Sequence, residues 1–270
     1  MIAAAVSALV LSASPQLEAA ASAGAGYDSN LNHADPTVTA IGSGFAVLRA
    51  SGGASMGLGD STNLYAGLRF DDEEYPEYSD LTTRTVGVEL SLVQELGDQV
   101  AVVLTPWASQ GWSGDPARDA TTVAAQVTLR WRPVRDLALR GSYAYTSRAA
   151  ADPVFSSDRN RLGASVEWRV LPRTYLSLAG ALEQGDEVFY RSTGGAGGSG
   201  MGRMGGGGGG FGDAQEPYSA PATTLSAGPA LEIGLGSSVY LVGSFEARRV
   251  QSDAADLRSQ SVYVALGARL

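Results

Sequence analysis

The chain has 270 residues, a net charge of -9 and no cysteine. The lack of cysteine excludes a disulfide scaffold, a thiolate metal site and a cysteine nucleophile. The negative charge argues against nucleic acid as a partner, because phosphate binding needs a basic face. No run of about twenty apolar residues occurs, so the sequence offers no candidate for a membrane-spanning helix.

Residues 1–13 form a short apolar segment that ends in small residues. This composition predicts a secretory signal peptide with cleavage near Ala13 or Ser14. No basic residue precedes the segment, so either translation starts upstream or the signal is atypical. A buried first strand or helix is the alternative interpretation. Residues 14–270 are expected to form one domain.

Apolar and polar residues alternate along most of this domain, and a period of two predicts β-strands. Pro106 removes a backbone donor from one of these strands, and Gly52-Gly53 interrupts another. The expected strands cover residues 18–27, 37–58, 63–70, 82–96, 100–109, 123–132, 137–148, 161–170, 175–183, 225–233, 239–245 and 262–270.

The clearest pattern is the segment Thr121–Arg148. Two alternating runs flank a tight break at residues 133–136, which is the pattern of a β-hairpin. One face of each run is apolar and the other is small and polar, and aromatic residues stand near the ends of the apolar face. A hairpin of a transmembrane β-barrel has this pattern.

The predicted connections alternate in length along the chain. Short turns are expected near residues 60, 97, 134, 172 and 236, and longer loops near residues 32, 75, 115, 153, 204 and 254. The longer loops include an acidic segment at residues 71–80 and a glycine-rich segment at residues 191–218. An up-and-down outer-membrane barrel alternates in this way, whereas a soluble β-sandwich does not need to.

The predicted fold is therefore an all-β, transmembrane, antiparallel up-and-down β-barrel of about 12 strands, with 10–14 possible. Charged residues on the polar face would line the lumen, and aromatic residues on the apolar face would form girdles at the membrane interfaces. The pore-lining candidates are Glu89, Arg130, Arg140, Arg161, Glu167, Arg169, Glu183, Glu232, Glu246 and Arg248. The girdle candidates are Trp131, Tyr143, Tyr145 and Trp168.

The lumen charges have two interpretations. They form a water-filled constriction with weak charge selectivity, or their Arg–Glu pairs brace a plugged lumen. The single histidine, His33, stands in a polar loop without the spacing of a catalytic triad, and the acidic residues 71–80 lack the spacing of an EF-hand. The glycine-rich run lacks a phosphate-loop ending. No catalytic residue, metal or cofactor is predicted, and the chain is not expected to be an enzyme.

The segment Ala25-Gly26-Tyr27-Asp28-Ser29-Asn30 and the rhythm of the hairpins resemble the start of bacterial outer-membrane β-barrels. Similar starts occur in barrels that follow tetratricopeptide repeats or belong to polysaccharide- and lipoprotein-export systems. The resemblance implies a porin-like or export-associated channel for polar solutes in a Gram-negative outer membrane. It implies membrane lipid, lipopolysaccharide, the barrel-assembly machinery and export-system proteins as partners. A plugged scaffold barrel that binds a periplasmic or surface partner is the alternative.

Overall fold

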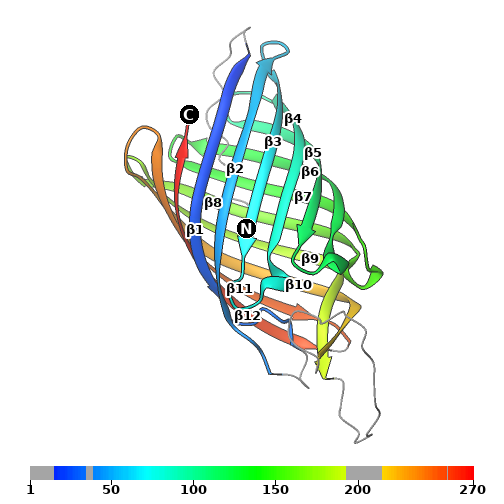
Figure 1. The fold of residues 1–270 in the computed structure, drawn as a ribbon. Helices are drawn as coiled ribbons and strands as arrows, with labels where there is room; N and C mark the ends of the chain where they lie inside the picture. The colour runs from blue at the N-terminus through cyan, green and yellow to red at the C-terminus, as the bar shows by residue number, and fades with distance from the viewer. Residues whose placement is uncertain (1–14, 35–38, 193–214, 254) are drawn as a thin grey trace, which may run out of the picture.

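A computed structural model describes residues 15–34, 39–192, 215–253 and 255–270, and residues 1–14, which include the predicted signal peptide, lie outside this part. Within it, twelve antiparallel strands form one closed barrel (Figure 1). The strands are β1 (Gln16–Asp28), β2 (Ser43–Gly57), β3 (Thr62–Glu74), β4 (Thr83–Glu95), β5 (Val100–Ser113), β6 (Ala120–Val134), β7 (Leu137–Ala150), β8 (Ser157–Leu171), β9 (Thr174–Ser192), β10 (Gln215–Gly234), β11 (Val239–Gln251) and β12 (Asp256–Arg269).

Each strand pairs with its neighbours in the chain, and β1 closes the barrel against β12. The predicted all-β up-and-down barrel of about 12 strands is confirmed. Closure pairs the strand edges that an open sheet would expose. No helix in the described ranges is long and apolar enough to span a membrane.

Short turns and longer loops alternate between the two ends of the barrel, as the sequence predicts. At the short-turn end, β1 begins and β12 ends, and the Leu270 N–H donates to the Ala19 carbonyl at 3.0 Å. The turn after β4 contains Gly97 at φ 118°, which a side chain disfavours. Three of the connections at the long-loop end contain a 3₁₀ turn: η1 (Ser79–Leu81), η2 (Pro116–Arg118) and η3 (Pro153–Phe155).

Exposure alternates along each strand, which separates the two faces of the wall. The outer face carries exposed Leu, Val and aromatic side chains, such as Leu68, Val88 and Leu178 at 54–61%. The inner face carries small and charged residues, as in β1, where Glu18 and Ser22 point inward. A wall with an apolar outside and a polar inside suits hydrocarbon around it and water within it.

Two prolines leave gaps in the strand ladders without shifting their register. The β4–β5 pairing stops at Glu89 and Trp107 and resumes at Leu92, so Pro106 disrupts the ladder as predicted. The β10–β11 pairing stops at Ala227 and resumes at Ala230, on either side of Pro229. Proline has no N–H to donate, so its strand loses a bond on one side.

Several predicted boundaries are wrong, including those of β11, which runs to Gln251 rather than to residue 245, and of β12, which begins at Asp256 rather than at residue 262. The second strand begins at Ser43 rather than at residue 37, and its Gly52 and Gly53 pair without a break. The acidic segment at residues 71–80 is not all loop, because β3 continues to Glu74. The ends of the glycine-rich segment at residues 191–218 are strand, since β9 reaches Ser192 and β10 begins at Gln215; residues 193–214 lie outside the described part.

Candidate functional site: the barrel lumen

All ten pore-lining candidates lie on the inner side of the wall, in phase with the inward positions of their strands. Seven of them form ion pairs. Four of these pairs are Arg140–Glu167 at 3.2 Å, Arg161–Glu183 at 3.7 Å, Arg248–Glu187 at 3.1 Å and Arg269–Glu232 at 3.0 Å. Arg169 pairs with Asp136, which lies in the turn between β6 and β7. Glu89, Arg130 and Glu246 have no ion-pair partner within 4.0 Å in the described ranges.

The four girdle candidates point outward, each about half exposed. Trp131 and Trp168 flank the turns that join β6 to β7 and β8 to β9, at the short-turn end. Tyr143 and Tyr145 lie nearer the long-loop end, where their hydroxyls donate to Asn160 and Asp158 on β8 at 2.6 and 3.2 Å. The outer wall therefore carries aromatic residues on both sides of its apolar band, where membrane interfaces would lie.

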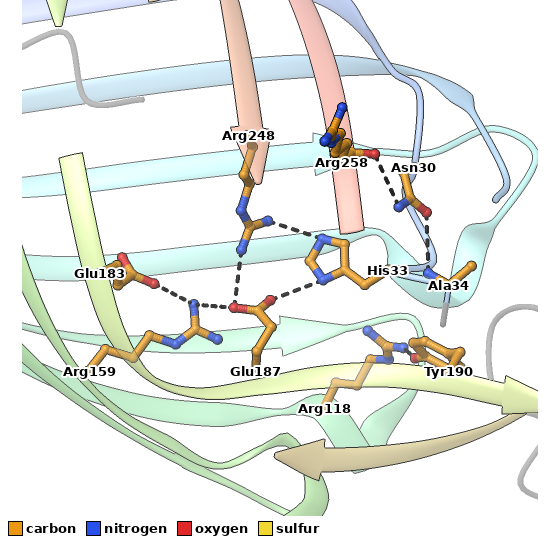
Figure 2. Close-up of polar contacts among 10 residues, drawn as sticks. All are labelled: Asn30, His33, Ala34, Arg118, Arg159, Glu183, Glu187, Tyr190, Arg248 and Arg258. Atoms are coloured by element: carbon orange, nitrogen blue, oxygen red, sulfur yellow. Dashed lines mark hydrogen bonds and ion pairs between the residues drawn. The ribbon is translucent and has the colours of Figure 1, made fainter. Parts of the chain in front are cut away.

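The loop between β1 and β2 folds inward against the wall formed by β9–β12. We call residues 29–42 the β1–β2 loop, of which 35–38 lie outside the described part. Ala34 forms a parallel bridge with Tyr190 at the end of β9. The Asn30 side chain accepts from the Ala34 N–H at 3.2 Å and donates to the Arg258 carbonyl of β12 at 3.4 Å (Figure 2).

His33, at the tip of this loop, meets a network of inward charges on β9 and β11 (Figure 2). Its Nδ1 lies 3.0 Å from Glu187 Oε1, and its Nε2 lies 3.0 Å from Arg248 Nη1. Because a guanidinium only donates, Nε2 accepts from Arg248 and Nδ1–H donates to Glu187. This geometry selects the neutral imidazole with its proton on Nδ1.

Glu187 is the centre of this network. Arg248 Nη2 at 3.1 Å and Arg159 Nη1 at 3.5 Å contact its Oε2, and Arg159 also contacts Glu183 at 3.1 Å. Glu187 lies beyond the level of Tyr145, and so outside the apolar band. Its burial alone would raise its pKa, but the hydrogen bond from His33 and the charges of Arg248 and Arg159 outweigh burial and lower the pKa to about 2.

A small apolar core lies on the same wall, inside the barrel. Phe189 is fully buried and packs with Val250, Ala255 and Leu257, with Tyr218 and two alanines of β10 around them. Asn32 is also fully buried and holds the loop's own backbone, donating to the Thr39 carbonyl and accepting from the Ile41 N–H. The inner wall of β9–β12 is therefore packed at the long-loop end.

The opposite wall, from β2 to β7, encloses a cavity of about 310 Å³ at the same end. Four arginines and two carboxylates line it: Arg49, Arg69, Arg118, Arg148, Asp71 and Glu73. The Arg69 guanidinium lies 5.5 Å from the ring centroid of Trp107, also in the lining. We call the long-loop end of the lumen its mouth. The β1–β2 loop thus occupies one side of the mouth and leaves the other side hollow.

Several residues of this mouth are absent from the predicted set, among them Glu187, Asp71, Arg69 and Trp107. Arg69 lies on the polar face of the predicted strand 63–70, and Asp71 could have been found by extending the period of two beyond Phe70, since both are in the inward phase of β3. Glu187 follows Gly185, where the apolar alternation weakens, and no local signal identifies its contact with His33. In the described part, no group of three His, Asp or Glu side chains could hold a metal ion.

Comparisons with known proteins identify the fold. No protein-family model matches the sequence. No curated protein matches it either. An outer-membrane channel from Pseudomonas putida F1 is similar in structure, with a TM-score of 0.57, 11% identity and all of both chains covered. The NanC porin has a TM-score of 0.52 and 15% identity, over 93% of this chain and 100% of that chain. This chain therefore has the fold of bacterial outer-membrane β-barrels.

Proposed function

We propose that this protein is a passive channel for small polar solutes in the bacterial outer membrane, with a mouth narrowed by the β1–β2 loop. The observation that carries the proposal is the solvent accessibility of the paired charges in the lumen. Arg140, Glu167, Glu232 and Arg269 form ion pairs inside a closed wall, yet their side chains remain 24–33% exposed. A lumen packed solid would bury them, whereas a water-filled one leaves them accessible.

The alternative is a scaffold barrel with a plugged lumen. The buried core around Phe189 and the inward loop favour it, because they occupy part of the mouth. The cavity beside β2–β7 favours a constriction over a seal, since it extends the hollow lumen along the other wall. An export-associated role is compatible with the same geometry.

In the proposed orientation, the long loops face the cell exterior and the short turns face the periplasm, which is the usual arrangement of such barrels. The β1–β2 loop then narrows the outer mouth. The barrel-assembly machinery would insert the chain, and membrane lipid and lipopolysaccharide would surround it.

Single-channel recording in planar bilayers tests the proposal. The refolded chain is expected to give discrete conductance steps, and Arg140→Ala should change their size because Arg140 lies in the lumen beside Glu167. Arg84→Ala is the control, since the 60% exposed Arg84 side chain lies on the outer wall with Asp72 and Glu74. A folded barrel that gives no steps would contradict the channel and favour the plugged scaffold.

A further inference from the structure

The outer wall carries a hollow of about 360 Å³ at its long-loop end. It lies across β10, β11 and β12, and its outward lining includes Leu225, Ala227, Ala247, Arg249, Arg258 and Gln260. Ala227 and Ala247 are paired directly across the two strands. Two methyl side chains side by side, with longer ones around them, leave the depression with an apolar floor.

The charge at this hollow is unusual for a strand pair. Arg249 and Arg258 stand directly opposite each other on β11 and β12, both outward. Like charges in that position destabilise a sheet unless something compensates them. Asp256 compensates Arg249 with two bonds, at 2.9 and 2.6 Å. Arg258 has no carboxylate within ion-pair distance among the residues that the structure describes.

The hollow also lies at the border of the apolar band. Next to it, toward the short-turn end, Phe245 on β11 pairs with Val262 on β12, which pairs with Tyr27 on β1. Val262 and Tyr27 are outward and about 50% exposed. The wall therefore presents, in order, two guanidinium groups, a depression with small residues and then an apolar surface.

We propose that this hollow binds the phosphorylated lipid portion of lipopolysaccharide, with a phosphate on Arg258 and an acyl chain over Ala227 and Ala247. A guanidinium binds phosphate oxygens in a bidentate manner, and a basic patch beside apolar surface matches an anionic lipid. Lipopolysaccharide is the anionic lipid of the outer leaflet, which the long-loop end faces. The inference rests on the membrane location and orientation proposed above, and it does not depend on channel activity.

The contacts favour this occupant over two others. A free phosphate would use Arg258 but leave the apolar floor uncovered. A solute passing through the lumen would not meet Ala227, Ala247 or Arg258, because these side chains point outward. Free phosphate and lipid A share the phosphate group, so comparing their binding separates the contribution of the phosphate from that of the acyl chains.

The test measures binding of diphosphorylated lipid A to the folded barrel in detergent, as a shift of its thermal midpoint with lipid concentration. Phosphatidylglycerol and inorganic phosphate are the comparison probes. The wild-type barrel should bind lipid A more tightly than either, and Arg258→Gln should weaken lipid A binding at least tenfold. Ala247→Leu, which fills the hollow but keeps both arginines, should weaken it as well.

Arg84→Gln is the matched control, because Arg84 is an outward arginine at the same end whose carboxylate partners, Asp72 and Glu74, already compensate it. It should bind lipid A as the wild type does. Unchanged lipid A binding in Arg258→Gln would overturn the proposal. Equal binding of phosphatidylglycerol or of inorganic phosphate by the wild type would overturn it too. Conductance is not part of the readout, so a failed channel proposal and a failed lipid site remain distinguishable.

Discussion

Glu187 contacts three basic residues in the lumen: His33, Arg159 and Arg248. Its side chain is 7% exposed, and removing its charge leaves the partly buried Arg248 without a carboxylate partner in the described part of the chain, whereas Arg159 keeps Glu183. The lowering of its pKa from 4.5 to about 2 corresponds to about 3 kcal/mol of stability. Because the pKa is lowered by folding, this contribution is present above about pH 4.5 and lost as the pH falls toward 2.

Glu187→Gln should therefore lower the free energy of unfolding by about 3 kcal/mol at pH 7, and by roughly half that or less at pH 3. Urea unfolding of the barrel in lipid vesicles at the two pH values measures both differences. Glu232→Gln is the control, since the Glu232–Arg269 pair is about a third exposed and should contribute less than about 1 kcal/mol. Equal losses of unfolding free energy in the two variants would show that the network around His33 stabilises the barrel no more than an exposed ion pair does.

For single residues, the sequence predicts which face of the wall a side chain occupies but not which side chain it contacts. The period of two correctly places Arg248 and Glu183 on the inner face, because each strand turns alternate residues inward. It does not predict that His33 reaches Glu187, since that contact depends on how a loop from β1 folds onto β9. The loop is held by hydrogen bonds of Asn30 and Asn32, and no periodic pattern predicts them.

Among the described glycines of the strands, Gly228 on β10 has the least room for a side chain, because it faces the backbone of β11. A Cβ added to Gly228 would overlap the Phe245 carbonyl oxygen of β11. Backbone cannot move aside as a flexible side chain can, and the neighbouring Pro229 already weakens this ladder. Gly228→Ala should therefore separate the two strands locally and destabilise the barrel by about 1–3 kcal/mol.

Gly141→Ala in β7 provides the comparison, because a Cβ there meets nothing within 4 Å. The folded fraction of each variant can be followed by the change in gel migration between unheated and heated samples. Gly228→Ala should lose its folded form at a lower urea concentration than Gly141→Ala. If both variants behave like the wild type, β10 and β11 are less tightly apposed than the structure indicates.

The sequence predicts the strands better than their ends. Alternation places β4, β6, β7 and β8 within a few residues of their bounds, because both faces of these strands are strongly patterned. It stops short for β3, where Asp71–Glu74 are acidic but still paired. It also stops short for β9 and β10, because both strands extend past the apolar band. Pairing there comes from the neighbouring strand and leaves no alternation of apolar residues.

For the whole molecule, the rhythm of short turns and long loops is enough to predict a closed barrel, since only closure satisfies every strand edge in a membrane. The rhythm does not predict the net charge that lines the lumen, because that charge depends on which side chains form ion pairs. Seven of the ten charged candidates are neutralised in ion pairs, whereas Arg130, Glu89 and Glu246 have no ion-pair partner in the described part of the chain. Unpaired charges should dominate the field that a passing ion experiences.

Arg130→Gln should therefore shift ion selectivity toward cations, and Glu89→Gln should shift it toward anions. The measurement is the reversal potential across a bilayer under a salt gradient. Both shifts should be larger at low salt, where charges are less screened. Arg84→Gln, on the outer wall, should leave the potential unchanged. If both lumen variants move the potential in the same direction, or neither moves it while conductance persists, ions do not pass these side chains and the conducting path is not the one that the barrel encloses.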